Sequence, residues 1–308
     1  MAYEYLTMLD LAKFNGSDSV VGLIEENLNA APEAAMFPAR TISGTSYKTL
    51  IRTAIPQPEF RKPNEGTEPK RSRYDNKLVE CYYLDGQLEM DVAISQADDM
   101  GEAHALALEA DGIARGSLLT IGTQVWYGTG TGGDSDGFPG AVQIVDSALT
   151  LDAGGTTANT GSSVYGVKLG EKFASLVFGK GSVFSLGEWR KQTITRSSKE
   201  MTAWKNSLEG WVGIQWVNKY SVCRIKKLTD DSGKGLTDAL GAEMLSKLPV
   251  GFVPDAWFMS RRSRFQLQKS RATAQANIGV VNPPIPNEMC GIPIVVTDSL
   301  LNTEALTL

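Results

Sequence analysis

Histidine is almost absent from this sequence of 308 residues, and cysteine is scarce. His104 is the single histidine, although catalytic triads, His-based acid–base pairs and most zinc sites depend on that side chain. Cys81, Cys223 and Cys290 lie far apart and are odd in number. This favours reduced, packed thiols in a cytoplasmic environment over a disulfide framework or a zinc site. The side chains that hydrolytic and zinc enzymes use most often are therefore scarce. The simpler interpretation of His104 is a packed or solvated residue of a helix.

Long apolar runs and an excess of positive charge are absent as well. No uninterrupted apolar stretch approaches the roughly 20 residues that a membrane-spanning helix needs. The first residues, MAYEYLTMLDLAKF, lack the basic start that leads into the apolar run of a signal peptide. Since the net charge is -5, contact with a nucleic acid has to come from a local patch and not from a global basic field. We expect no membrane partner.

What the sequence does contain is an ordinary supply of apolar residues. With 42% hydrophobic and 21% charged residues, it can bury a sizeable core in two domains or in one elaborated domain. Residues 1–38 are interpreted as an arm, because apolar residues recur at helical spacing within SDSVVGLIEENLNAA and Pro38 ends the section.

Residues 39–85 have the pattern of two long strands joined by a charged loop. The segments SYKTLIRTAI and KLVECYYLDG alternate polar with apolar residues, and the loop between them is rich in proline and charge. A projecting arm is the favoured interpretation, and a disordered surface loop is the alternative. Charged side chains near the tip are candidates for ion pairs between subunits, each weak alone. They are Arg61, Lys62, Glu65, Glu68, Lys70, Arg71 and Arg73.

A strand and then a long helix are predicted within residues 86–139. GQLEMDVAIS alternates as a strand with one apolar face, and apolar residues from about 98 to 126 recur at spacings of three and four. At about 1.5 Å per residue, this helix is about 40 Å long. Such a helix is long enough to extend across the molecule.

A glycine-rich stretch, WYGTGTGGDSDGFPG, follows the predicted helix and matches the dinucleotide-binding pattern at Gly128, Gly130 and Gly133. That pattern has to follow a strand and open a helix, whereas here a helix precedes it and the next segment, FPGAVQIV, looks extended. No Lys-Ser or Lys-Thr pair follows for a P-loop, and Val145 stands where a calcium loop starting at Asp134 needs a glutamate. No motif in this stretch therefore indicates a bound cofactor or metal ion. The sequence favours a hinge made by Gly128, Gly130, Gly132 and Gly133.

Residues 140–308 have the mixed pattern of helices and strands. Strands dominate up to about residue 225, a helix is predicted over GKGLTDALGAEMLSKLP, a short strand over AWFMS, and a final strand over CGIPIVVTDSLL. The segment SRRSRFQLQKSR is predicted as a basic helix, which can bind phosphate groups of a nucleic acid or pair with acidic residues of a neighbouring subunit. Both alternatives stay open for its positive charges, which are Arg261, Arg262, Arg264, Lys269 and Arg271.

The order of these elements resembles the major capsid protein of tailed bacteriophages, whose fold is named for coliphage Hong Kong ninety-seven. Several phrases are similar to members of that superfamily, namely FPARTISGTSYKTLIRTAIPQPEFRKPNEG, WYGTGTGG, SSVYGVKLGEKFASLVFGKG, EGWVGIQWVNKYSVCRI and CGIPIVVTDSL. The resemblance covers nearly the whole chain and implies an α+β fold. Residues 1–38 would be the N-terminal arm and 39–85 the extended β-hairpin loop. Residues 86–139 would be the peripheral domain with its spine helix and glycine hinge, and 140–308 the axial domain, with late segments returning to the peripheral domain.

The resemblance also implies a function. Such a protein is not an enzyme but self-assembles into pentamers and hexamers, which form the icosahedral head shell around double-stranded DNA and contact that DNA without sequence specificity. It would be located in the virion after assembly in the host cytoplasm, with a portal and, in some shells, a decoration protein as further partners. Because few residues precede the hairpin, we expect a separate scaffolding protein. Nothing in the hairpin identifies the residues of an isopeptide cross-link.

Two other functions are alternatives to a virion shell. An encapsulin-like nanocompartment would share the fold and enclose enzyme cargo in place of DNA. A nucleotide-binding enzyme would use the loop from Gly128 to Gly133, and binding of a nucleotide to that loop would be its signature.

Overall fold

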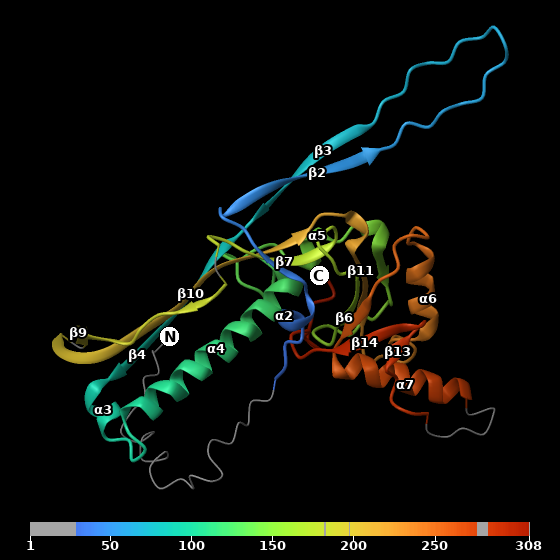
Figure 1. Ribbon diagram of the computed structural model, residues 1–308. Helices are drawn as coiled ribbons and strands as arrows, with labels where there is room; N and C mark the ends of the chain where they lie inside the picture. The colour runs from blue at the N-terminus through green and yellow to red at the C-terminus, as the bar shows by residue number, and fades with distance from the viewer. Residues whose placement is uncertain (1–28, 182, 197, 276–282, 308) are drawn as a thin grey trace.

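A long hairpin, a helix-backed ribbon of strands and a mixed sheet with two helices make up the molecule (Figure 1). The computed structural model describes residues 29–181, 183–196, 198–275 and 283–307. Most of the helical pattern noted within residues 17–31 lies outside the described residues. The observed mixture of helices and strands agrees with the predicted α+β class.

The hairpin consists of β2 (Ser46–Ala54) and β3 (Arg73–Glu80), which pair antiparallel. Residues 55–72 join the two strands without forming helix or strand, and nearly all of them are exposed. Figure 1 shows the hairpin leading away from the body of the molecule, as the alternating pattern predicts.

The returning strand predicted in KLVECYYLDG divides in two at Cys81. Its first half is β3, and its second half opens β4 (Tyr82–Asp91), which pairs antiparallel with β10 (Lys199–Trp216) in a different sheet. Residues 82–85 therefore lie in the ribbon and not in the projecting hairpin.

The strand β4 also ends earlier than the strand predicted over residues 86–95. The carboxylate of Asp91 accepts a hydrogen bond from the backbone N–H of Ala93 and so caps helix α3 (Val92–Gln96). A local capping residue thus overrides the alternation of polar and apolar residues.

We call the strands β4, β9 and β10 the ribbon. They belong to a sheet ordered β1-β7-β10-β4, in which β8 and β9 also pair with β10. Helix α4 (Glu102–Tyr127), which confirms the long helix predicted from about 98 to 126, packs along β4. Gly86 lies where the two elements touch, since a Cβ there would lie 3.0 Å from Cγ1 of Ile113. The other strands are β1 (Ala39–Thr41), β7 (Ala174–Phe178), β8 (Ser185–Leu186) and β9 (Arg190–Arg196).

A second sheet, ordered β13-β14-β12-β6-β11-β5, lies at the other end of α4 (Figure 1). Met244 of α6 and Leu267 of α7 pack in one buried cluster with Trp257 of β12. Helix α6, strand β12, helix α7 and strand β14 confirm the elements predicted here. The bounds are β5 (Thr150–Asp152), β6 (Ser162–Val167), β11 (Val222–Leu228), α6 (Asp238–Ser246), β12 (Ala256–Met259), α7 (Arg261–Gln275), β13 (Glu288–Met289) and β14 (Ile292–Val296).

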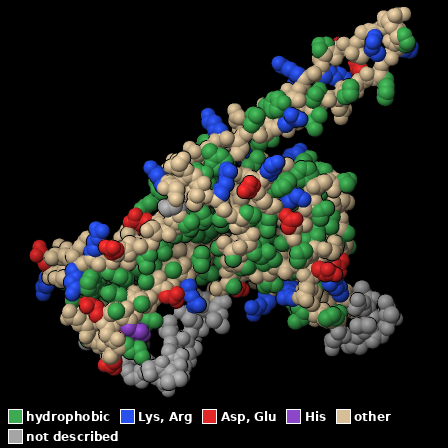
Figure 2. Space-filling view, in the orientation of Figure 1, with side chains coloured by type: hydrophobic (Ala, Val, Ile, Leu, Met, Phe, Trp, Pro, Cys, Tyr) green, Lys and Arg blue, Asp and Glu red, His purple; other side chains and the backbone are tan. Residues whose placement is uncertain are grey.

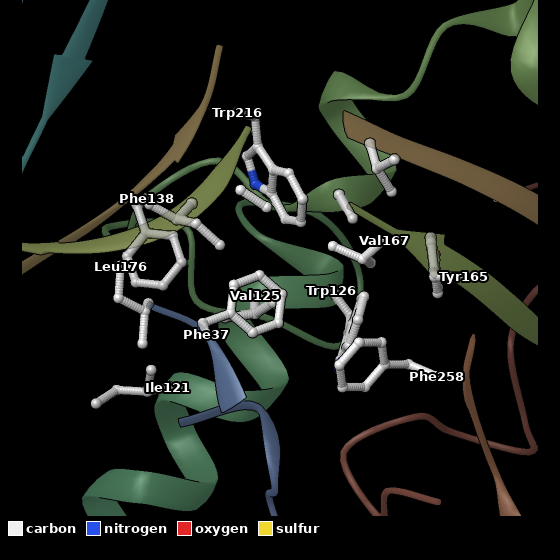
Figure 3. Packing of buried hydrophobic residues seen from close by; sticks show 14 of the residues in the cluster. Phe37, Ile121, Val125, Trp126, Phe138, Tyr165, Val167, Leu176, Trp216 and Phe258 are labelled. Atoms are coloured by element: carbon white, nitrogen blue, oxygen red, sulfur yellow. The ribbon is translucent and has the colours of Figure 1, made fainter. Parts of the chain in front are cut away.

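Aromatic side chains fill the joint at which the arm, α4 and the two sheets meet (Figure 3). The ring centroid of Phe37 lies 6.3 Å from that of Trp126, 5.9 Å from that of Trp216 and 5.8 Å from that of Phe258. Trp126 also stacks on Tyr165 at 4.9 Å. We call these five buried side chains the joint core, since they come from the arm, α4 and both sheets.

The segment FPGAVQIV, which looks extended in the sequence, contains a short helix instead. Helix α5 (Ala141–Ile144) begins after Gly140, whose backbone N–H donates to the side-chain oxygen of Gln143. The prediction is wrong because a side chain three residues on caps the turn, and the apolar pattern does not reveal that contact. One further short helix, α2 (Glu33–Met36), precedes the joint core in the arm.

Candidate interaction surfaces

His104 pairs with Asp98 at the start of α4. Within the described residues, no group of three or more His, Cys, Asp or Glu side chains is placed to hold a metal ion. Nδ1 of His104, in the first turn of α4, lies 3.1 Å from Oδ2 of Asp98, whose side chain is 2% exposed. The pair links the helix to the turn before it. No helix in the described part of the chain combines the length and the apolar character needed to cross a membrane.

The amides of the glycine-rich stretch are used by the chain itself. The backbone N–H groups of Gly128, Gly130 and Gly133 donate to the carbonyl oxygens of Gln124, Tyr127 and Gly130, respectively. A phosphate cradle needs such amides to be free and to open a helix, whereas this stretch follows the C-terminus of α4. The geometry therefore gives no support to nucleotide binding at this loop.

Two glutamine side chains hold the stretch against α4. Gln124 accepts a hydrogen bond from the backbone N–H of Asp134 at 2.8 Å and donates to the carbonyl oxygen of Phe138 at 2.8 Å. Nε2 of Gln143 donates to the carbonyl oxygen of Tyr127 at 2.7 Å. Both amides fasten the loop to the last turn of α4.

The glycines permit backbone contacts that a side chain would block. Gly128 has a φ of 53°, and a Cβ on it would lie 2.0 Å from the backbone nitrogen of Gly140. A Cβ on Gly133 would lie 2.0 Å from the carbonyl oxygen of Gly128. Packing alone therefore accounts for these two glycines. The hinge role of Gly128, Gly130, Gly132 and Gly133 stays a prediction.

The root of the hairpin is fixed to the end of β10 by polar contacts. Oε1 of the buried Gln215 accepts hydrogen bonds from the Tyr47 hydroxyl and, at 3.1 Å, from the guanidinium of Arg40. Nζ of Lys77 donates to the carbonyl oxygen of Trp216, and burial lowers the pKa of Lys77 below its ordinary value. The chain itself therefore sets the direction in which the hairpin leaves.

Beyond its root, the hairpin exposes large apolar side chains. Leu50, Ile55 and Phe60 are 69%, 72% and 108% exposed. Figure 2 shows basic and hydrophobic side chains spread along the whole hairpin. An isolated two-stranded hairpin is marginally stable in water. Because exposed apolar patches are typical of interaction sites, the hairpin is a candidate contact surface.

Some of the charged residues predicted for subunit contacts interact within the hairpin tip. Nζ of Lys70 lies 3.0 Å from Oε2 of Glu59, and the guanidinium of Arg61 donates to the carbonyl oxygen of Glu65 at 2.7 Å. Pairing of the tip residues between subunits stays a prediction. The exposed side chains of that set include Lys62, Glu65, Glu68, Arg71 and Arg73.

The basic residues of α7 are used mainly inside the chain. Arg271 binds the carboxylate of Asp238 through two contacts of 2.7 Å. Arg262 and Arg264 donate to oxygen atoms of nearby loops, with a shortest contact of 2.6 Å for each. These three arginines therefore have partners within their own chain, and the two alternatives left by the sequence stay predictions. The exposed members of the set are Arg261 and Lys269.

Glu304 joins α4 to the second sheet. Its two carboxylate oxygens accept hydrogen bonds from the hydroxyl of Tyr127 and from Oγ of Ser163, both at 2.6 Å, and the guanidinium of Arg224 lies 3.4 Å away. Burial, and then the charge of Glu304, raise the pKa of Tyr127 above its ordinary value. No local sequence pattern marks Glu304, because its partners come from three separate segments of the chain.

Glu33 has the same role for the arm. Its side chain is fully buried, and Oε1 accepts a hydrogen bond from Nε1 of Trp126 at 2.6 Å. Burial raises the pKa of Glu33, while hydrogen bonds from Thr297, Trp126 and Ser299 oppose the rise. No sequence pattern predicts this contact, since an acid in a short helix usually faces solvent.

The outer face of the ribbon carries an acidic pair beside an aromatic pair. In the register of β4 and β10, Asp85 lies opposite Glu209, and Tyr83 lies opposite Trp211 with its ring centroid 5.2 Å away. We call these four residues and Gln87, on the same side of β4, the ribbon face. A groove of about 430 Å³ borders it, with a lining that includes Gln87, Glu188, Arg190, Lys205, Ser207 and Glu209.

Comparison with known proteins places this architecture in a family. The family profile described as Major capsid protein GP7 matches residues 17–307. The fold is similar to a chain in the structure of bacteriophage Epsilon15, with a TM-score of 0.72 at 19% sequence identity, over 99% of this chain and 98% of that one. The capsid of bacteriophage JBD30 gives a TM-score of 0.55 at 9% identity, over 96% of this chain and 99% of that one. No curated protein sequence matches the chain.

Proposed function

Because the chain belongs to the GP7 family of major capsid proteins and is a structural component of a phage head shell, we propose that it assembles into pentamers and hexamers of an icosahedral shell around double-stranded DNA. Its role is structural and not enzymatic, and its place is the capsid shell of the virion. Assembly of that shell in the host cytoplasm is part of the proposal.

The exposed hairpin is the observation that supports this proposal best. Its root is anchored through Gln215, whereas Leu50, Ile55 and Phe60 are left exposed by the described part of the chain. A hairpin that is aimed by its own subunit and left uncovered is suited to lie over a neighbouring copy. Many such contacts, each weak, give a closed shell its stability.

The parts of the chain take distinct roles in this proposal. Residues 1–38 form the N-terminal arm, 39–85 the extended loop, 86–139 the peripheral domain with α4 as its spine, and 140–308 the axial domain. The pairing of β10 with β4 supports a return of the later chain into the peripheral domain. The glycine-rich stretch lies at the boundary between spine and axial domain.

Further partners follow from the shell itself. A shell that is filled with DNA needs a portal, and we include a separate scaffolding protein and, for some shells, a decoration protein. Arg261 and Lys269 are exposed on α7 and are the members of the basic set best placed for non-specific contact with phosphate groups. The DNA contact is assigned to these two residues and not to Arg262, Arg264 or Arg271.

A truncation of the hairpin tests the proposed function. Residues 55–72 are replaced by Asn-Gly, which closes β2 and β3 with a two-residue turn. We expect the wild-type chain to form shells or capsomer rings in negative-stain electron micrographs, and the truncated chain to remain folded but unassembled at the same concentration. A wild-type chain that stays monomeric at every concentration would contradict the proposal. Gly66→Ala, in the open tip of the hairpin, serves as the control.

The two rival functions are not favoured. The matching family profile is that of a phage major capsid protein, which argues for a DNA-filled head over an encapsulin-like compartment. The amides of Gly128, Gly130 and Gly133 are bonded within the chain, which argues against a nucleotide-binding enzyme.

A further inference from the structure

One face of the hairpin combines apolar and basic side chains. In the register of β2 and β3, Lys48 lies opposite Leu78, Leu50 opposite Asn76, and Arg52 opposite Tyr74. Directly opposite residues and alternate residues of a strand share one side of the sheet, so these six side chains form one surface, which we call the Leu50 face. Leu50, Tyr74 and Leu78 are 69%, 54% and 48% exposed.

The ribbon face has the opposite charge. Asp85 and Glu209 are like charges directly opposite each other on neighbouring strands, an arrangement that costs free energy unless a cation approaches. In the described part of the chain, Asp85 is bound by the side-chain amide of Gln87, and Glu209 by the hydroxyl groups of Ser207 and Tyr83. These hydrogen bonds keep the carboxylates in place without neutralising them. Arg190 and Lys205 line the neighbouring groove, and Nζ of Lys205 lies 3.4 Å from Oε2 of Glu89.

The aromatic part of the ribbon face adds an apolar component. Tyr83 is 49% exposed and packs against Trp211, beside the acidic pair. A partner for this face therefore needs positive charge and apolar side chains within one flat surface. A metal ion or a small cation supplies only the first of these.

We propose that the Leu50 face of one subunit lies on the ribbon face of a neighbouring subunit, with Lys48 and Arg52 against Asp85 and Glu209 and with Leu50 against the Tyr83–Trp211 pair. The proposal rests on the shell function proposed above and names the surfaces that meet in it. Charge complementarity and the match of apolar with aromatic side chains support this partner.

The shape of the subunit requires the contact to form between copies. Figure 1 shows the hairpin and the β4–β9–β10 end of the ribbon leading in opposite directions from the body. The hairpin root is held by Gln215 and Lys77, so the Leu50 face cannot fold back onto the ribbon of its own chain. A second copy can present its hairpin there.

Charge reversal and rescue test the proposal. The variant Lys48→Glu/Arg52→Glu and the variant Asp85→Lys/Glu209→Lys each place like charges against each other, and we expect each to raise the concentration needed for shell assembly about tenfold or more. The variant with all four substitutions keeps the net charge of the wild type and restores opposite charges, so we expect assembly near the wild-type concentration. Light scattering and electron microscopy give the readout.

The outcomes separate this inference from the proposed function. If wild-type chains assemble and the four-fold variant assembles no better than the two double variants, the contact proposed here is wrong and the shell function survives. If wild-type chains do not assemble at all, the shell function itself is wrong. If the double variants assemble as the wild type does and fail only to bind a second viral protein, the ribbon face serves a different partner and the inference is overturned.

A disulfide trap gives an independent readout. The exposed Cys290 is changed to Ser, the buried Cys81 and Cys223 are kept, and new cysteines are placed at Leu50 and Gln87. Oxidised shells should then give a ladder of covalent oligomers on a non-reducing denaturing gel. The matched control carries Leu50→Cys with Glu243→Cys, an exposed residue on α6 that belongs to neither face. A ladder in the control equal to that of the test pair would contradict the proposal.

Discussion

The joint core and the hairpin beyond its root differ in how far their large apolar side chains are buried. In the joint core, Phe37, Trp126 and Phe258 are buried against one another, and the nearby Glu33 has its hydrogen-bond partners within the chain. In the hairpin, Leu50 and Phe60 are exposed. The core is therefore complete in one subunit, whereas the hairpin leaves large apolar side chains exposed.

This difference predicts how substitutions divide between folding and assembly. Changes in the joint core should lower the free energy of unfolding of a single subunit. Changes on the outer hairpin should leave that free energy nearly unchanged and weaken the contacts between subunits. The predictions below are ordered by the size of their expected effect on unfolding.

The largest effect is expected for Trp126→Ala. The substitution removes a fully buried indole and leaves the carboxylate of Glu33 without its Nε1–H donor, which together cost about 4–5 kcal/mol of unfolding free energy. Urea unfolding of dissociated subunits measures this. Phe60→Ala, at the exposed tip, is the matched aromatic control and should stay within about 0.5 kcal/mol of the wild type. Equal losses of unfolding free energy in the two variants would contradict the prediction that joint-core changes affect folding and hairpin changes affect assembly.

Glu304→Ala should have the next largest effect. It leaves the buried guanidinium of Arg224 and the hydroxyl groups of Tyr127 and Ser163 without their shared acceptor, at a cost of about 3–4 kcal/mol. The same urea titration checks the value. Glu304→Gln keeps the shape and one acceptor oxygen, so it should recover part of the loss. A Gln variant as unstable as the Ala variant would show that shape and hydrogen bonding contribute nothing.

Gly128→Ala tests the packing of the glycine-rich stretch. Since the new Cβ would lie 2.0 Å from the backbone nitrogen of Gly140 and the residue has a positive φ, we expect a loss of about 2–3 kcal/mol. Gly66→Ala, which places a Cβ in open space at the hairpin tip, should cost nothing measurable. If Gly128→Ala were equally harmless, the stretch would be loose, as a free hinge requires.

Sequence patterns predicted the hairpin, α4 and α7 because each depends on neighbours in the sequence. Alternation along β2 and β3 and the spacing of apolar residues in α4 report on faces that form locally. The same local patterns failed at Asp91 and at Gln143, where one side chain caps a helix and ends or interrupts an extended run. A single capping contact of this kind outweighs several residues of propensity.

The contact surfaces were predicted only in part for a different reason. The charged tip is visible in the sequence because its residues are adjacent. The acidic pair of Asp85 and Glu209 exists only through the register of β4 and β10, and the contacts of Glu304 join segments that are far apart in the chain. Long-range pairing of this kind has no local pattern. For the same reason, the sequence could not show that Arg271 binds Asp238 inside the subunit.

The buried carboxyl of Glu33 makes the stability of the joint depend on pH. Its pKa in the folded chain lies above the ordinary value of 4.5, so the folded state holds the proton more tightly than the unfolded state. The stability that comes from neutral Glu33 is complete below pH 4.5 and is lost as the pH rises through the raised pKa. Within that window the slope is at most about 1.4 kcal/mol per pH unit. Urea titrations between pH 4 and 8 should show this loss in the wild type and not in Glu33→Gln. An identical slope in both proteins would contradict it.

The smallest effect on unfolding is expected at the charged tip. Lys70 and Glu59 form an ion pair 3.0 Å long with side chains 42% and 48% exposed, so Lys70→Ala should change the unfolding free energy by less than about 0.5 kcal/mol. If the tip also contacts a neighbouring subunit, the same substitution should raise the concentration needed for assembly and make assembly more sensitive to salt. Lys172→Ala, an exposed lysine on the loop between β6 and β7 and outside the hairpin tip, removes the same charge and serves as the control. A tip variant that lowers the unfolding free energy of the single subunit as strongly as Glu304→Ala would mean that the hairpin, too, is completed by its own chain.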